Sequence, residues 1–107
     1  MNTSHNACIT ACQACIVACE TCISACLTHP AQMASCIRAC LECIELCKLC
    51  VSMMAKKSSF CEAVCALCAK VCTACAEACE AHADHHACCR DCAASCRACA
   101  SACLACC

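Results

Sequence analysis

The sequence contains no glycine, no tryptophan and no tyrosine, and its 107 residues include one proline and one phenylalanine. Because glycine weakens the interior of a helix, its absence favours uninterrupted helices with short connections. Phe60 is the only member of the Phe, Trp and Tyr group. The chain therefore lacks the aromatic platforms on which single-stranded nucleic acids stack their bases.

Charge of either sign is also scarce. Seven Lys and Arg residues against eight Asp and Glu residues give a net charge of −1, which provides no basic field for nucleic acid or anionic lipid. Polar residues interrupt every stretch of about 18 residues, the length that a membrane-spanning helix needs. The opening segment MNTSH shows no signal-peptide pattern. We therefore expect a cytoplasmic protein with no nucleic-acid and no membrane partner.

Large apolar side chains are few. Leu, Ile, Val and Phe together number 16, a share so low that it is more typical of disordered or marginally stable chains. Cysteine and 24 alanines supply the remaining apolar surface, but a thiol buries much less area than a leucine side chain. We predict a modestly stable metal-free state.

Cysteine, in contrast, is abundant, with 25 residues. Twenty-three of them follow at alternating spacings of four and three residues in four blocks, and we call these the seam cysteines. They are Cys8, Cys12, Cys15, Cys19, Cys22 and Cys26; Cys36, Cys40, Cys43, Cys47 and Cys50; Cys61, Cys65, Cys68, Cys72, Cys75 and Cys79; and Cys89, Cys92, Cys96, Cys99, Cys103 and Cys106. Because an α-helix has 3.6 residues per turn, this spacing keeps each block on one narrow stripe of a helix.

Three breaks between the blocks predict four helices, near residues 4–27, 31–56, 59–81 and 85–106. Pro30 can open a helix but cannot continue one, Ser59 begins a capping-box pattern, and Asp84 is a natural N-cap. Helices of similar length joined by short loops pack antiparallel. We therefore predict an all-α, up-down-up-down four-helix bundle with a cysteine-lined core, formed as a single domain by residues 1–107.

A disulfide scaffold is disfavoured as the role of these cysteines. An odd number of them cannot pair fully within one chain, and disulfides have torsion preferences that regular helix does not meet systematically. Crowded thiols stay reduced in the cytosol, which agrees with the expected location.

Histidine and methionine continue the seams beyond the cysteines. The same three- and four-residue steps lead to His5, His29, Met33, Met54, His82, His85 and His86. In an antiparallel bundle His29, Met33 and the last three histidines gather at one end, where they could act as a mouth for metal ions. The alternative is that these histidines are ordinary loop residues and that the methionines fill gaps in the core.

Thiolates at this spacing favour Cu(I). Two cysteines four residues apart can bridge one small ion, and Cu(I) accepts two or three sulfur ligands whereas Zn(II) prefers four. Several four-thiolate Zn(II) sites would each leave a charge of −2 in a dry core, which is strongly unfavourable. With two unshared thiolates per ion the chain would hold about 12 ions, rising toward about 25 if thiolates bridge, and each ion should release protons on binding.

The repeated Cys-x-x-x-Cys motifs resemble those of the bacterial copper storage proteins. They are Cys8/Cys12, Cys15/Cys19, Cys22/Cys26, Cys36/Cys40, Cys43/Cys47, Cys61/Cys65, Cys68/Cys72, Cys75/Cys79, Cys92/Cys96 and Cys99/Cys103. The resemblance covers essentially the whole chain and is closest to the cytosolic branch. It implies multiple Cu(I) ions bound by inward-facing thiolates, and a homotetramer of bundles. Cys88 and Cys107 lie off the seams as rim ligands or surface thiols.

Three other functions compete with copper storage. A general thiolate sink for Zn(II), Cd(II) or Cu(I), of the metallothionein kind, usually has irregular Cys-x-Cys spacing and glycine-rich turns, which this chain lacks. A thiol-redox protein or copper-cluster enzyme needs one or two distinguished cysteines, and here all look alike, so we expect no enzyme. A purely structural bundle would be built better from leucine.

Overall fold

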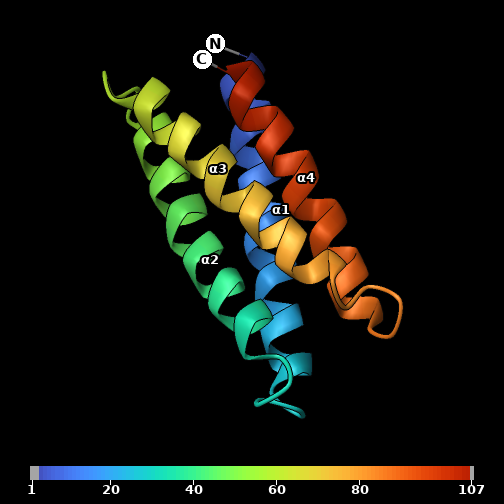
Figure 1. Cartoon of the computed structure of the whole chain (residues 1–107). Coiled ribbons are helices and arrows are strands. Elements are labelled where there is room, and N and C mark those ends of the chain that lie inside the picture. Colours follow the sequence, from blue (N-terminus) through green and yellow to red (C-terminus); the bar gives the residue numbers. More distant parts are fainter. Residues whose placement is uncertain (1–2, 107) are drawn as a thin grey trace.

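The computed structural model describes residues 3–106 of the chain. Over these residues it contains four helices and no strand: α1 (Thr3–Cys26), α2 (Ala34–Ala55), α3 (Cys61–Glu80) and α4 (Ala87–Cys106). The helices run alternately up and down, and the two ends of the chain lie at the same end of the molecule (Figure 1).

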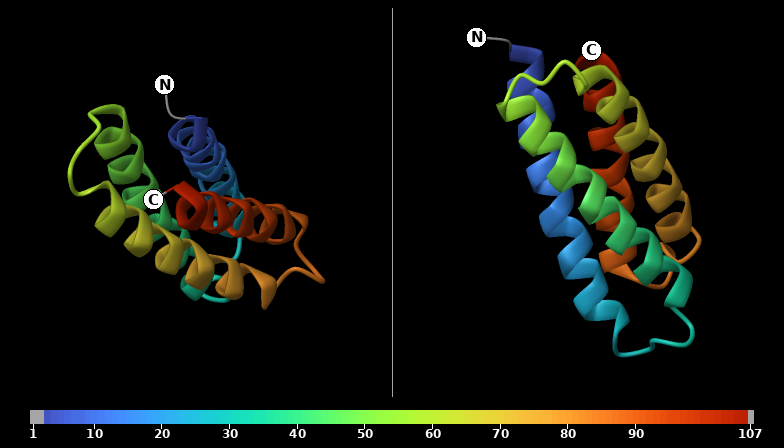
Figure 2. Two further views of the ribbon diagram at one scale, coloured as in Figure 1. Left: turned by 90° about the horizontal axis from the view of Figure 1, so that it is seen from above. Right: turned by 90° about the vertical axis from the view of Figure 1, so that its left-hand side faces the viewer.

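Each helix packs against two neighbours. Helix α1 contacts α2 and α4, and α3 contacts the same two helices, so that α1 faces α3 across the core. The bundle measures 42 × 18 × 18 Å, and two further views show the four rods enclosing one long axis (Figure 2). The predicted all-α, up-down-up-down four-helix bundle is confirmed.

Cysteine fills the core of this bundle, as predicted. All 23 seam cysteines are buried, and 18 of them have no exposed surface at all. The aliphatic side chains that accompany the seams, such as Ile9, Ile16 and Ile37, are only partly buried and pack around the cysteines. The interior is therefore narrow and built mainly of sulfur.

Helices α3 and α4 begin later than predicted, because the expected N-caps do not form. Helix α3 begins at Cys61 with Phe60 at its N-cap, and no side-chain capping bond is present there. The capping box from Ser59 is therefore wrong, and Ser58 Oγ accepts a hydrogen bond from the Phe60 N–H at 3.0 Å instead. Asp84 is not an N-cap either, since α4 starts three residues later.

The start of α2 also differs from its predicted position, and turns flank this helix at both ends. Helix α2 begins at Ala34 instead of residue 31, because Pro30 lies within a series of turns at residues 27–33. At its other end Lys57 has φ 54°, and the N–H groups of Lys57 and Ser58 bond the carbonyls of Met54 and Met53 at 3.0 Å each. This is a Schellman motif in which lysine takes the left-handed position usually given to glycine.

Helix α1 is long and apolar enough to cross a membrane. The segment His5–Cys26 has a mean hydropathy of 1.6, but core helices of water-soluble proteins can be as long and as apolar. Much of its apolar character comes from cysteines that lie inside the bundle. The absence of a membrane partner stays a prediction.

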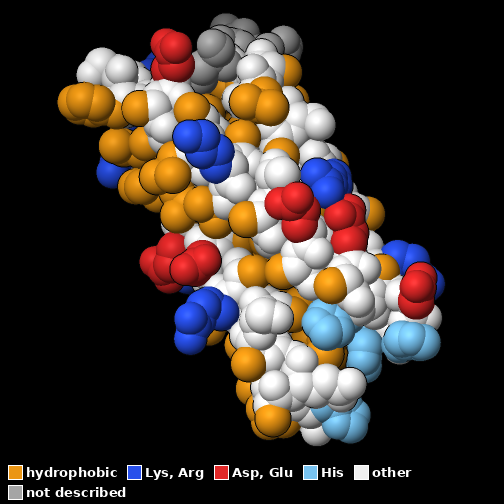
Figure 3. Space-filling view, viewed as in Figure 1, with side chains coloured by type: hydrophobic (Ala, Val, Ile, Leu, Met, Phe, Trp, Pro, Cys, Tyr) orange, Lys and Arg blue, Asp and Glu red, His pale blue; other side chains and the backbone are white. Residues whose placement is uncertain are grey.

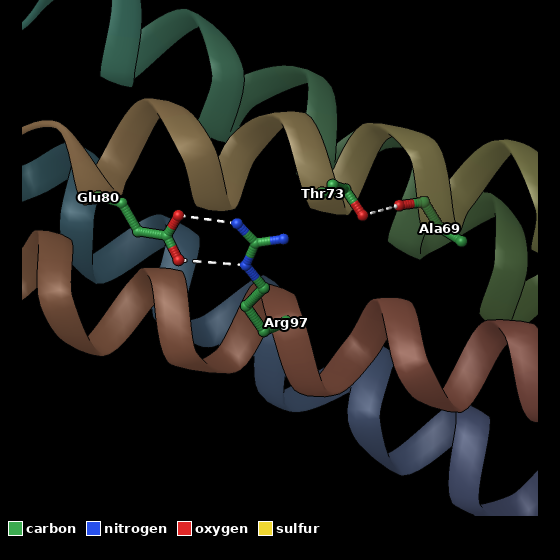
Figure 4. Close-up of polar contacts among 4 residues, drawn as sticks. All are labelled: Ala69, Thr73, Glu80 and Arg97. Carbon is green, nitrogen blue, oxygen red and sulfur yellow. Dashed lines mark hydrogen bonds and ion pairs between the residues drawn. The ribbon is translucent and has the colours of Figure 1, made fainter.

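An ion pair joins α3 to α4 on the outside of the bundle. Glu80 accepts two hydrogen bonds from the Arg97 guanidinium, at 3.1 Å from Nε and 2.8 Å from Nη2 (Figure 4). The same view shows the Thr73 hydroxyl donating to the Ala69 carbonyl within α3 at 2.8 Å. Both features lie outside the cysteine core.

Candidate metal centre

The seam cysteines stack in five tiers, each with one thiol from every helix. Because the helices are antiparallel and share the same spacing, the blocks of α1 and α3 descend while those of α2 and α4 ascend. The tiers are Cys8, Cys50, Cys65 and Cys103; Cys12, Cys47, Cys68 and Cys99; Cys15, Cys43, Cys72 and Cys96; Cys19, Cys40, Cys75 and Cys92; and Cys22, Cys36, Cys79 and Cys89. Cys26 lies beyond one end of this stack, and Cys61 and Cys106 beyond the other.

Most short sulfur contacts cross between helices. The Cys36 Sγ lies 3.3 Å from that of Cys79, and the Cys8 Sγ lies 3.5 Å from that of Cys103. Contacts within a Cys-x-x-x-Cys motif also occur, as between Cys22 and Cys26 at 3.8 Å, and the Cys68/Cys72 and Cys92/Cys96 pairs are similar. An ion in this core has sulfur ligands available both along one helix and across to the next.

Groups of four thiols lie within one tier or link two neighbouring tiers. In each group all four Sγ atoms lie within 4.8 Å of one another. The groups include Cys8, Cys12, Cys50 and Cys103; Cys12, Cys47, Cys68 and Cys99; Cys15, Cys19, Cys43 and Cys96; Cys15, Cys43, Cys47 and Cys72; and Cys19, Cys75, Cys92 and Cys96. Several cysteines belong to two groups. The groups cannot all be filled by separate four-coordinate ions, so bound ions would have to share thiolates.

The core holds no charge to balance thiolates. Among the side chains that the structure describes, none that is polar or charged is buried, and the 24 described cysteines form no disulfide. Burial raises the pKa of the thiols of Cys26, Cys36 and Cys89, because a thiolate there would lose its hydration. These thiols are neutral in the metal-free protein at pH 7.

Contacts between thiols split the pKa values of neighbouring cysteines. A hydrogen bond lowers the pKa of Cys15 and raises that of its partner Cys19. Hydrogen bonds from Cys40 and Cys79 likewise lower the pKa of Cys22 to about 6. The physical cause is that a thiolate is stabilised by the S–H groups that donate to it, while each donor must keep its proton.

The end of the bundle that holds the turns between α1 and α2 and between α3 and α4 gathers the histidines, and we call it the histidine end. His29, Met33, His82, His85 and His86 all lie there, as predicted, and pale-blue histidines cluster at the lower part of Figure 3. His82 and His86 are half-buried with ring centroids 6.3 Å apart in an edge-on arrangement. His29 and His85 are exposed, whereas Met33 is buried.

The opposite end, which we call the methionine end, is closed by Met54. This side chain is 2% exposed, and its Sδ lies 3.7 Å from the Sγ atoms of both Cys65 and Cys106. Cys61 is also buried at this end, with its Sγ 3.5 Å from the Met53 carbonyl oxygen. His5 lies in the first turns of α1 at the same end and is half-buried.

Comparison with known proteins agrees with this sulfur-filled interior. The family model described as copper storage protein matches residues 1–107. The chain belongs to the copper storage protein family. Among proteins with curated functions, none matches the chain.

Solved structures of this copper storage family have the same fold. The Cu(I)-bound copper storage protein BsCsp3 is 38% identical, with a TM-score of 0.90 over 96% of this chain and 97% of that chain. A cytosolic copper storage protein from Streptomyces lividans, with five coppers, is 34% identical, with a TM-score of 0.93 over 97% and 92% of the two chains. Ccsp from the same organism, loaded with 10 copper equivalents, is 35% identical, with a TM-score of 0.92 over 96% and 83%.

Two cysteines of this copper storage protein lie off the seams. Cys88 is half-buried, with its Sγ 4.0 Å from that of Cys89 at the histidine end. Cys107 lies outside the described residues.

The burial and tier of each seam cysteine follow from the spacing, but the contacts of Met54 with two particular thiols depend on how far α2, α3 and α4 are staggered. The four-residue step from Cys50 was the only sequence signal for them.

Proposed function

We propose that this protein stores Cu(I), with many ions held among the 23 seam cysteines. The observation that carries the proposal is the set of overlapping four-thiol groups that continues from tier to tier. A chaperone or sensor needs one or a few sites, whereas a continuous stack of thiols provides capacity. Storage, rather than catalysis, is also the role that the family description indicates.

The charge of the core supports Cu(I) over Zn(II). No buried cation is present among the described side chains to compensate an excess of thiolates. One Cu(I) per thiolate leaves the core neutral, whereas Zn(II) held by four thiolates leaves −2 at each site. Shared thiolates also suit Cu(I), which accepts two or three sulfur ligands.

The proposed ligands are the seam cysteines, with histidine and methionine at the two ends. His29, Met33, His82, His85 and His86 would receive or release ions at the histidine end, and His5 and Met54 are the candidates at the other. Histidine nitrogens are weaker partners for Cu(I) than thiolates, so an ion held there is free to move inward.

The wider setting of the protein is also proposed. We place it in the cytoplasm, as a single-domain chain without enzymatic activity that assembles into a homotetramer. A cytosolic relative supports the location, and the uniform burial of the seam cysteines leaves none distinguished as a catalytic nucleophile.

An anaerobic titration tests the function. Fully reduced, metal-free protein is titrated with Cu(I) against a chromophoric chelator of known affinity, and in parallel with Zn(II). Storage predicts more than about ten Cu(I) per chain that outcompete the chelator, with few Zn(II) retained. A few ions of either metal, or a preference for Zn(II), would instead indicate a general thiolate sink.

A double variant sharpens the result. Cys15 and Cys19 belong to different overlapping four-thiol groups as well as to a common one. Replacing both with serine should remove about one or two ions and leave the rest in place, as expected for many similar sites that share thiolates. Loss of all copper would mean that one cooperative cluster, not a store of similar sites, holds the metal.

A further inference from the structure

Three sulfur atoms at the methionine end form a nearly equilateral triangle. The Met54 Sδ lies 3.7 Å from the Cys65 Sγ and 3.7 Å from the Cys106 Sγ, and the two thiols are 3.9 Å apart. The three side chains come from α2, α3 and α4. Cys65 and Met54 are 1% and 2% exposed, so the donors are packed in place.

This triangle has the size of a three-coordinate metal site. An ion at its centre would lie about 2.2 Å from every sulfur, close to the ~2.3 Å of zinc–thiolate bonds in proteins. A second triangle, Cys22, Cys36 and Cys89 at the histidine end, has edges of 3.8, 3.9 and 3.8 Å, so the two sets differ in donor type and hardly in dimensions.

The thioether changes what the triangle can hold. Methionine sulfur is a soft, neutral ligand that suits Cu(I), whereas Zn(II) sites draw on thiolate, imidazole and carboxylate. A thioether adds no negative charge, so it attracts a cation less than a third thiolate would. Copper at this triangle is therefore held more weakly than copper among thiolates alone.

The triangle also lies beside the surface. A hollow between α3 and α4 is lined by Glu62, Cys65, Ala66, Cys103 and Leu104. Cys106, at 8% exposed, is the most accessible of the seam cysteines. The hollow beside Cys65 and the slight exposure of Cys106 give the triangle a side of approach that is separate from the histidine end.

We propose that Met54, Cys65 and Cys106 form a Cu(I) site of one thioether and two thiolates, which fills last and gives up its ion first to thiols approaching through the α3–α4 hollow. The transfer is a ligand exchange: two incoming thiols lose their protons to the two departing thiolates, and copper stays Cu(I). The site rests on the proposed storage function and adds a second place of exchange, opposite the histidines.

Methionine methyl resonances test this site directly. The full chain is labelled with [methyl-13C]methionine, and its spectra are followed as Cu(I) is added anaerobically. Cu(I) has a closed d shell, so the resonances are not broadened by paramagnetism. We expect the Met54 methyl to shift late in the titration, after most of the copper is bound, and to return first when glutathione or a chelator removes copper.

Met54→Leu and Met53→Leu form a matched pair. Leucine conserves most of the side-chain volume, so both variants should fold; each loses one thioether at the same end of the bundle. Met54→Leu should bind about one Cu(I) fewer and lose the fraction that glutathione extracts fastest, whereas Met53→Leu should match the parent. Helix content by circular dichroism confirms that both are folded.

The outcomes separate this proposal from the storage function. A Met54 methyl that stays fixed in a fully loaded protein overturns the site while leaving storage intact. A shift complete within the first equivalents overturns the weak, late-filling character of the site. Binding of only a few ions in total, by contrast, overturns the storage function itself.

Discussion

The two ends of the cysteine core hold sulfur triangles of nearly equal size but unequal chemistry. At the histidine end the three donors are the thiols of Cys22, Cys36 and Cys89, whereas at the methionine end one donor is the thioether of Met54. The helix seam fixes how far apart the sulfurs lie. The residue type at one seam position then sets the charge, and with it the affinity for copper, without altering the spacing.

The surroundings of the two triangles differ as well. The histidine end has the His82 and His86 pair beside it, and its thiols Cys36 and Cys89 have pKa values raised by burial. The methionine end has instead a surface hollow between α3 and α4 that Cys65 helps to line. The comparison predicts imidazole-assisted uptake at one end and thiol-driven exchange at the other.

The largest effect is expected from pH on the metal-free protein. The pKa values of Cys26, Cys36 and Cys89 are raised by burial above the ordinary value of 9.0, so the folded state keeps protons that the unfolded chain loses. Their contribution to the free energy of unfolding is complete below pH 9 and is lost as the pH rises beyond it. The slope is about 1.4 kcal/mol per pH unit for each thiol.

Thermal unfolding of anaerobic samples between pH 8 and pH 10 measures this slope. Cys26→Ala should make it shallower, whereas Met54→Leu, which removes a sulfur that does not titrate, should leave it unchanged. Copper-loaded protein should lose much less stability, because its thiolates are already deprotonated and bound. A metal-free protein equally stable at pH 8 and pH 10 would contradict the raised pKa values of Cys26, Cys36 and Cys89.

A smaller effect is expected on the rate of copper uptake. Replacing His82, His85 and His86 with alanine removes the weaker ligands at the histidine end, and we expect uptake or release to slow by about tenfold, comparable with the loss of a supporting group at a metal site. Capacity should fall by no more than about one ion, because every seam cysteine remains. Stopped-flow transfer from a Cu(I)–chelator complex gives the rate.

His5→Ala is the matched control, since it removes an imidazole from the methionine end. Uptake by this variant should slow much less than uptake by the triple variant, because His5 is a candidate ligand at the end opposite the proposed mouth. If the triple variant loads at the parental rate, the histidines are ordinary loop residues and ions enter elsewhere, with the α3–α4 hollow as the remaining route.

The fold and the identity of the buried thiols could be predicted from the sequence, because residues spaced alternately four and three apart lie on one face of a helix. Cys15 and Cys43 must face the core wherever their helices lie. The caps at Ser59 and Asp84 were wrong because local patterns compete with the packing that decides where each turn ends. Ser58 instead accepts a hydrogen bond from the Phe60 N–H in the turn before α3, which caps no helix.

The sulfur contacts between different helices could not be predicted from the sequence. Spacing along one helix predicts the Cys22 to Cys26 contact but not the one between Cys36 and Cys79, since the latter depends on the relative height of α2 and α3. The same holds for Met54, whose seam position was evident but whose two thiol partners were not. The assignment of histidine and methionine ligands stays a prediction that metal binding must test.

The smallest effect is expected from the ion pair between α3 and α4. Glu80 is the last residue of α3, so its bonds to Arg97 brace the helices toward the histidine end. The pair is nearly half exposed, and exposed pairs contribute little and are screened by salt. Arg97→Gln should therefore lower the Tm slightly at low salt, with copper capacity and uptake rate unchanged.

The pH dependence of the Tm difference between Arg97→Gln and the parent shows whether the ion pair causes that difference. The Arg97 guanidinium lowers the pKa of the Glu80 carboxyl below its ordinary value of 4.5, so the pair contributes stability above that pH and loses it as the pH falls through the lowered value. The Tm difference between Arg97→Gln and the parent should vanish in high salt and in acid. A difference that persists under both conditions would mean that the arginine stem packs against α3. A changed uptake rate would mean that the spacing of α3 and α4 controls the histidine end.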